Sequence, residues 1–274
     1  MIVHHLNAGT MCPMSAKLVN GKGGLFSRAR LVCHILLLET DEGLVLVDTG
    51  LGLGDIEDPH RLGPIWLKSA SPRLDPEETA LEQVKGLGFS PSDVRDILLT
   101  HLDRDHAGGI ADFPSAQAHI HIREKQAAIT CELAVHEGRY IKEQLVGRRD
   151  WVLYGEDGED WFGFKGVRAL NDRNPDVLVI PLHGHTPGHC GVAVRTTDGW
   201  ILHAGDSYYF NGQIDSPSRR APLGLRLLQR MTDTDRDQRI ANQGRLRELK
   251  CRHHAEVTII NSHDPLYYDA CCSH

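Results

Sequence analysis

The chain has 274 residues, of which 41% are hydrophobic and 24% charged, a composition typical of a globular protein and not of a disordered chain or a fibrous repeat. Its 37 Asp and Glu residues outnumber its 30 Lys and Arg residues, giving a formal net charge of −7, so nucleic acid is not favoured as a partner. The longest apolar run, residues 31–38, is far shorter than the roughly 20 residues that cross a bilayer, so we expect no membrane partner.

The amino terminus and the cysteines bear on the cellular compartment. No cationic segment followed by an apolar run opens the chain, so we expect no secretory signal. The seven cysteines are scattered and form no CxxC pair, which fits reduced thiols and a cytoplasmic protein. No internal repeat or Pro/Ser-rich linker divides the sequence, so we expect one domain over residues 1–274, with a homo-oligomer left open.

Strands and helices alternate along the predicted chain. Apolar runs and turn residues predict strands at 1–8, 31–39, 44–48, 96–100 and 118–122, and then at 177–181, 191–195, 200–204 and 257–261. Helices are expected at 75–86, 123–146 and 233–253. The aromatic segment at 150–173 is expected to be a long loop, with a lid and simple packing on the core as the two alternatives. This order predicts an α/β domain.

Four groups of polar side chains each follow a predicted strand, where open α/β sheets gather functional residues. The groups are His101, Asp103, Asp105 and His106; His185; Asp206; and His263. Residues 101, 103 and 105 alternate, so they can face the same side of an extended segment. Neutral imidazoles combined with carboxylates suit zinc, iron or manganese. Seven such side chains are too many for one ion.

Other histidines have simpler expected roles. His183 and His203 flank ligand positions, and we expect them to support those positions. His119 and His121 share a strand face and could imitate a metal pair. No third ligand is close to them in the sequence, so we expect a solvated strand edge there.

At this point the chain resembles the metallo-β-lactamase fold superfamily. The motifs that carry the resemblance are the turn at 46–50, the block HLDRDHAGG at 101–109, the loop GHTPGH at 184–189, Gly205-Asp206, and Ser262-His263-Asp264. The spacings between these motifs resemble the lactonase-like branch. The resemblance implies an αββα sandwich, in which two mixed β-sheets are flanked by helices.

The resemblance also implies roles for the site residues. His101, Asp103 and His185 would hold one divalent metal ion, Asp105, His106 and His263 the second, and Asp206 would bridge them. Asp48 would be a structural acid that supports the site loops. Tyr209, with Tyr208 as the alternative, stands where lactonases carry a tyrosine that contacts the substrate carbonyl.

The chain departs from the family motif at Asp103. The usual block is HxHxDH, and this chain reads HxDxDH. A carboxylate adds negative charge and a hard donor, so it should lower the Lewis acidity of its metal and shift preference toward iron or manganese. We expect two zinc ions, with iron or manganese as the alternative.

The expected reaction is hydrolysis of a small-molecule ester, most plausibly a lactone or another carboxylic ester. A water shared by two ions is a hydroxide source at neutral pH, and Asp105 or Asp206 can take or return its proton. Three alternatives stay open: an iron-dependent oxidoreductase of the same fold, motivated by Asp103; a thioester hydrolase of the glyoxalase II kind; and a binding protein that has lost turnover.

Overall fold

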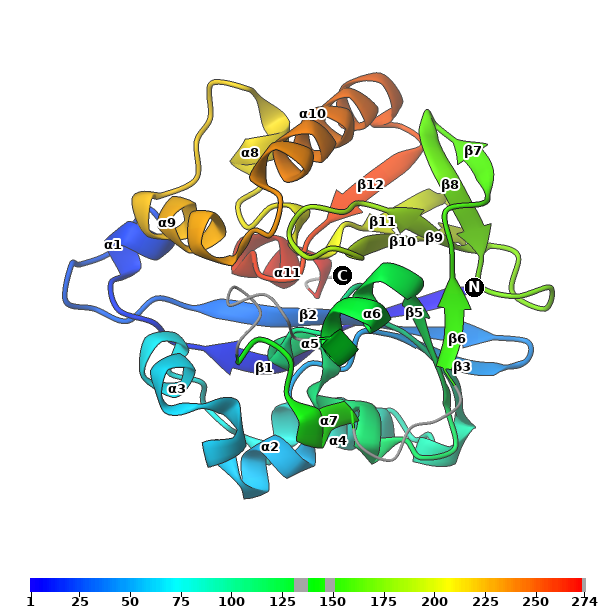
Figure 1. Cartoon of the computed structure of the whole chain (residues 1–274), viewed down its shortest axis with the longest axis horizontal. Coiled ribbons are helices and arrows are strands. Elements are labelled where there is room, and N and C mark those ends of the chain that lie inside the picture. Colours follow the sequence, from blue (N-terminus) through cyan, green and yellow to red (C-terminus); the bar gives the residue numbers. More distant parts are fainter. Residues whose placement is uncertain (131–137, 146–150, 273–274) are drawn as a thin grey trace.

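The computed structural model describes residues 1–130, 138–145 and 151–272, which form two six-stranded sheets packed face to face (Figure 1). The first sheet holds, in spatial order, β1 (Ile2–Met11), β2 (Leu31–Thr40), β3 (Gly43–Val47), β4 (Val94–Leu98), β5 (Gln117–His121) and β6 (Trp151–Tyr154). The second holds β12 (Val257–Ile260), β11 (Gly199–His203), β10 (Cys190–Thr196), β9 (Val177–Pro181), β8 (Phe164–Ala169) and β7 (Glu159–Trp161). Both sheets mix parallel and antiparallel pairs.

The apolar strands form the centre of the protein because their two faces are covered by different layers. On β2, Leu36 and Leu38 point toward the second sheet and pack with Val192 and Val194 of β10. Leu37, which alternates with them, packs on the opposite face. The continuous apolar run of β2 therefore reflects burial on both sides.

Helices cover the two outer faces, and the predicted αββα layering is confirmed (Figure 1). Leu81 and Val84 of α4 (Ala80–Gly86) pack against the first sheet. Leu246 and Leu249 of α10 (Arg236–His253) pack against the second. The remaining α-helices are α1 (Ala16–Val19), α2 (Leu53–Glu57), α3 (Pro64–Ala70), α5 (Arg104–Ala107), α6 (Ile122–Thr130), α7 (Lys142–Leu145), α8 (Gly212–Asp215), α9 (Leu223–Thr232) and α11 (Pro265–Cys271). No described helix is long and apolar enough to cross a membrane.

The prediction of a long aromatic loop was wrong. Residues 151–169 form β6, β7 and β8, and Trp161 is 8% exposed because it packs against Phe164 and Trp200. A tight turn at Phe162 and Gly163, both with positive φ, joins β7 to β8. Trp161 and Phe164 pack in the core of the second sheet, whereas Trp151 and Tyr154 lie on β6 of the first sheet. The strands are short and show little alternation of polar and apolar residues, so the sequence does not reveal them.

Three other elements differ from expectation. The helix expected at 75–86 is divided, because Thr79 is extended and its hydroxyl caps α4 by accepting from Glu82 N–H. In the helical region expected at 123–146, α6 ends at Thr130, and residues 131–137 lie outside the described residues. The solvated edge expected at His119 and His121 was wrong, since both side chains are 1% exposed.

Candidate metal centre

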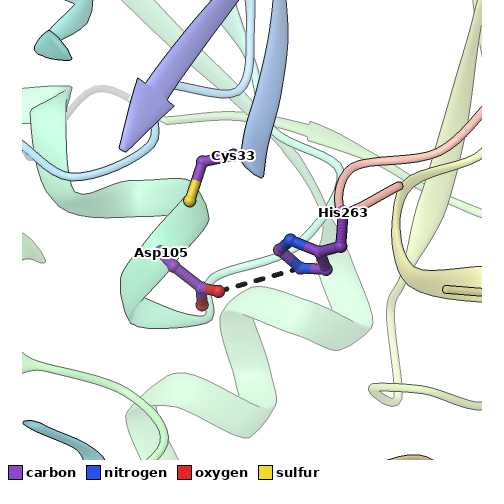
Figure 2. A group of neighbouring side chains, drawn as sticks. All are labelled: Cys33, Asp105 and His263. Carbon is purple, nitrogen blue, oxygen red and sulfur yellow. Dashed lines mark ion pairs between the residues drawn. The ribbon is translucent and has the colours of Figure 1, made fainter. Parts of the chain in front are cut away.

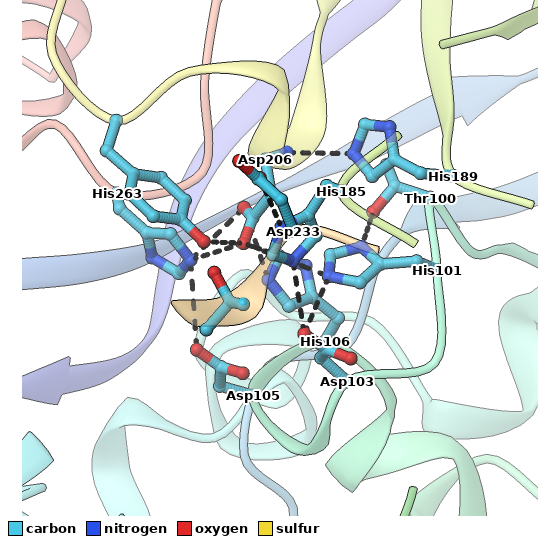
Figure 3. Close-up of polar contacts among 12 residues, drawn as sticks. Thr100, His101, Asp103, Asp105, His106, His185, His189, Asp206, Asp233 and His263 are labelled. Carbon is cyan, nitrogen blue, oxygen red and sulfur yellow. Dashed lines mark hydrogen bonds and ion pairs between the residues drawn. The ribbon is translucent and has the colours of Figure 1, made fainter. Parts of the chain in front are cut away.

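Four loops at the carboxyl ends of β4, β9, β11 and β12 meet at one place (Figure 3). The chain leaves β4 through Thr100 and His101, and α5 begins directly after Asp103. His185 follows β9, Asp206 follows β11, and His263 follows β12. The structure thus brings together all seven side chains that the sequence singled out, at a place where the strand ends of both sheets meet.

Asp206 is the centre of this group. Its Oδ1 lies 3.1 Å from His263 Nε2 and 3.5 Å from His106 Nε2. Its Oδ2 lies 3.4 Å from His185 Nε2 and 3.8 Å from His101 Nε2. Two triplets have ligand atoms within 4.8 Å of one another, one with His101 and His185 and the other with His106 and His263, and both include Asp206.

The two other carboxylates lie on either side of Asp206. Asp103 Oδ2 is 3.1 Å from His185 Nε2 and 3.5 Å from His101 Nε2, so it faces the first triplet. Asp105 Oδ2 is 3.7 Å from His263 Nε2, so it faces the second. The thiol of Cys33, on β2, lies beside this second group, within 4.8 Å of the ligand atoms of Asp105 and His263 (Figure 2).

Hydrogen bonds behind the rings fix their tautomers. Asp48 accepts from the Thr100 hydroxyl at 2.7 Å and from His106 Nδ1 at 2.9 Å. Because the Thr100 hydroxyl gives its proton to Asp48, it accepts from His101 Nδ1 at 2.9 Å. His263 Nδ1 donates to the Val32 carbonyl at 2.7 Å. With Nδ1 engaged in this way, each of the three rings in its neutral form would present the Nε2 lone pair to the centre, which is the form that binds a metal ion.

The donor set fits divalent metal ions. His101 Nε2 and His106 Nε2 are buried and have no hydrogen-bond partner, although buried polar atoms are normally paired. Imidazole nitrogens and carboxylate oxygens at these separations are ligands that zinc, iron and manganese accept. Metal ions bound here would give both orphaned nitrogens a partner.

Electrostatics at the centre favour the charged forms of its residues. Burial alone raises the pKa of Asp206, but His263 and His106 overcome this and hold that pKa well below its ordinary value. Burial alone lowers the pKa of His106, but the carboxylates of Asp206 and Asp48 raise it well above its usual range. Burial also lowers the pKa of His263, but Asp206 raises it above its ordinary value. The carboxylates thus supply a strong negative field in which cations are stabilised.

The residue before Asp206 must be glycine, because the His189 ring lies too close to the backbone there for any side chain. Gly205 has φ +53°, and a Cβ there would lie 2.5 Å from His189 Nε2. This nitrogen accepts from the Asp206 backbone N–H at 2.9 Å, while His189 Nδ1 donates to the Leu182 carbonyl. His189 therefore joins the loop of Asp206 to the loop of His185 and has no free ring nitrogen for a metal.

The structure distinguishes the two tyrosines that the sequence left open. The Tyr209 hydroxyl donates to Asp206 Oδ2 at 3.1 Å, so it points into the centre. The Tyr208 side chain is fully buried and its hydroxyl donates to the Ile259 carbonyl. Of the two, Tyr209 faces the candidate ligands.

Sequence reasoning missed Arg139. Its Nε forms an ion pair with Asp103 Oδ1 at 2.9 Å, and its two Nη atoms donate to the carbonyls of His185 and Thr232. The residue is 8% exposed. The signal available in the sequence is the carboxylate at position 103, which calls for a cation, but nothing in the sequence says which one.

Comparison with known proteins agrees with this geometry. The profile of the metallo-beta-lactamase superfamily matches residues 28–258, which is most of the chain. The chain belongs to the metallo-beta-lactamase superfamily. A probable metallo-hydrolase of Mycobacterium tuberculosis, Rv2300c, is 41% identical over 266 residues, covering 97% of this chain and 81% of the relative. The N-acyl homoserine lactonase AttM of Rhizobium radiobacter is 28% identical, covering 96% of this chain and 93% of the relative.

Solved structures have the same metallo-beta-lactamase fold. An N-acyl homoserine lactone hydrolase, described with the product N-hexanoyl-L-homoserine bound at its catalytic metal centre, superposes with a TM-score of 0.73 at 22% identity, covering 98% of this chain and 95% of that one. AidC, a dizinc quorum-quenching lactonase, gives a TM-score of 0.60 at 18% identity, covering 96% and 87%. This protein is thus a metallo-hydrolase related to lactonases.

Proposed function

We propose that the protein is a dinuclear metal-dependent hydrolase that opens lactones or cleaves other carboxylic esters. The observation that carries the proposal is the position of Asp206, whose carboxylate lies between two histidine pairs. Its Oδ1 faces His106 and its Oδ2 faces His101 and His185. His263 Nε2 lies 3.1 Å from Oδ1 and 3.2 Å from Oδ2. The similarity to lactonases supports the substrate class.

The two ions would be held by separate ligand sets. His101, Asp103 and His185 would hold one ion, Asp105, His106 and His263 would hold the other, and Asp206 would bridge them. When bound, such ions act as Lewis acids and lower the pKa of water from 15.7 toward about 7. The support comes from the orphaned Nε2 atoms of His101 and His106, which need cationic partners.

The remaining steps depend on side chains of this chain. The Tyr209 hydroxyl points into the centre, so it can donate to the carbonyl oxygen of a small-molecule substrate as negative charge develops there. Asp105, whose carboxylate faces His263, or Asp206 would accept a proton from water and return it to the leaving alkoxide. Asp48 and Thr100 hold His101 and His106 in the tautomers that the centre needs.

Arg139 bears on the choice of metal. A carboxylate at position 103 adds a negative charge that the usual histidine lacks, but its ion pair with Arg139 cancels that charge. The pair is net neutral, as a neutral histidine would be. We therefore favour zinc and hydrolysis, since the Lewis acidity of the first ion is restored.

An iron-dependent oxidoreductase is the second candidate, because Asp103 still offers a hard oxygen donor at 3.1 Å from His185 Nε2. It predicts that iron predominates in the purified protein and that oxygen is consumed with a reductant.

The test offers three substrates to the zinc-loaded protein: an N-acyl homoserine lactone, an aliphatic ester and a thioester. Hydrolysis of each is measured by the release of protons. We expect release with the lactone or ester, loss after chelation, and recovery with zinc. No hydrolysis of any of the three substrates by fully loaded protein would contradict the proposal, and oxygen uptake by an iron-loaded sample would favour the second candidate.

A further inference from the structure

Another cluster of metal-type side chains lies outside the candidate metal centre. It joins His121 at the end of β5, Glu156 between β6 and β7, and His183 in the loop that also carries His185. His183 Nε2 lies 3.5 Å and His121 Nε2 lies 3.7 Å from the same carboxylate oxygen, Glu156 Oε1. The centroids of the two imidazole rings are 4.6 Å apart.

Both rings present buried nitrogens that lack a partner. The exposed fraction is 1% for His121 and 6% for His183, and neither Nε2 has a hydrogen-bond partner. The Glu156 side chain is 51% exposed, so the cluster is open to solvent on that side. Both unpaired nitrogens face the same carboxylate oxygen, so a cation bound between them would have all three atoms as ligands.

Local geometry suits a metal ion. His183 Nδ1 donates to the His189 carbonyl at 3.0 Å, so its Nε2 carries the lone pair. Ligand atoms around a tetrahedral zinc ion with bonds of about 2.1 Å are separated by roughly 3.4 Å. The two nitrogen-to-oxygen separations in this cluster are close to that value.

We propose that His121, Glu156 and His183 form a further zinc-binding site, separate from the centre at Asp206, with solvent in the fourth position. The ion ties the end of β5 to the connection between β6 and β7 and to the loop that carries His185. The ion would brace the loop from which His185 reaches the candidate metal centre, and the solvent position would leave one coordination position open.

Binding requires two local changes, and both involve Arg123. The Arg123 guanidinium now forms an ion pair with Glu156 Oε1 at 2.8 Å, and its side chain is 48% exposed, so it can turn into solvent. The Arg123 backbone N–H donates to His121 Nδ1 at 3.3 Å, a long contact that is lost when this nitrogen takes the ring proton. Arg123 therefore competes with the metal ion for Glu156.

The experiment measures zinc binding at equilibrium by dialysis of the whole chain, with the bound metal counted by elemental analysis. The variants are His121→Gln, Glu156→Gln, Arg123→Gln and the matched control Asp157→Asn, which removes a neighbouring exposed carboxylate. Circular dichroism checks the fold of each variant. Because Glu156 is half exposed, its variant keeps the test decisive if His121→Gln does not fold.

We expect the parent chain and Asp157→Asn to bind one zinc ion more than His121→Gln. Glu156→Gln should weaken that extra site at least about tenfold, and Arg123→Gln should strengthen it. Equal zinc binding by the parent chain, His121→Gln and Glu156→Gln would overturn the proposal, as would an equal loss in Asp157→Asn. None of these variants removes a candidate ligand of the centre at Asp206, so failure here is distinct from failure of the proposed function.

Discussion

Replacing Arg139 by Gln tests whether this residue neutralises Asp103. The two charges are 2.9 Å apart and largely buried, so their Coulomb attraction is about 6 kcal/mol at an effective dielectric constant near 20. Removing one partner of such a pair costs about 3–5 kcal/mol after desolvation is counted. We expect Arg139→Gln to lower the unfolding free energy of the metal-free protein by that amount.

The loss should be smaller in the metal-loaded protein. A bound cation takes over the role of neutralising Asp103, so only the hydrogen bonds from Arg139 to the His185 and Thr232 carbonyls are missing. These two hydrogen bonds are lost with and without metal, so the difference between the two losses reports the ion pair between Arg139 and Asp103. The assay is urea unfolding of the parent and variant chains, each with and without zinc.

The matched control is Arg61→Gln. Arg61 also forms a largely buried ion pair, with Asp55 at 3.0 Å, but neither residue contacts the candidate ligands through any described interaction. The Arg61→Gln substitution should lower the free energy of unfolding by the same amount with and without metal. An Arg139→Gln effect that is likewise independent of metal would refute the argument that this residue balances the charge of Asp103.

Three further predictions concern single side chains. Asp206→Ala should lose bound metal and hydrolytic activity together, measured on the same sample, and full activity in this variant would exclude the dinuclear proposal. Tyr209→Phe should lower kcat by about 10²–10³ with metal content unchanged, because it deletes the hydroxyl that points into the centre; an unchanged kcat would remove Tyr209 from the reaction. His5→Gln should make the stability of the protein less sensitive to acid. In the folded protein, burial and then the charge of His203 lower the pKa of His5 from 6.5 to about 4. The unfolded chain therefore takes up a proton at higher pH than the folded protein does, and the stability falls as the pH drops from about 6.5 to about 4. Urea midpoints at the two ends of that range should differ less in His5→Gln than in the control His254→Gln, and equal slopes would contradict this reading.

Local patterns were sufficient to predict the sheet strands other than β6, β7 and β8, and to single out the seven polar residues. The apolar run of β2 and the turn residues around β3 and β10 depend on neighbours in the sequence, and so does the placement of each ligand after a strand. His185, Asp206 and His263 follow strands of the second sheet and could be expected to meet, whereas His101 follows β4 of the first sheet and joins them because the two sheets pack face to face.

Long-range contacts were beyond the sequence. Arg139 meets Asp103 because the chain after α6 returns to the centre, and nothing local to either residue encodes this ion pair. His121 lies near Glu156 because β5 pairs with β6, and near His183 because a loop of the second sheet packs beside it. Neither contact is local in the sequence, so the sequence alone predicted a solvated edge. The strands β6, β7 and β8 are short, and their aromatic residues are held by tertiary packing more than by alternation.

The most direct test of the dinuclear centre is anomalous scattering at the zinc edge from crystals of the zinc-loaded protein, which locates each ion separately. We predict two peaks about 3.5–4 Å apart on the two sides of the Asp206 carboxylate, one beside His101 and His185 and the other beside His106 and His263. A single peak there, or none, in fully loaded crystals would contradict the proposal that Asp206 bridges two metal ions.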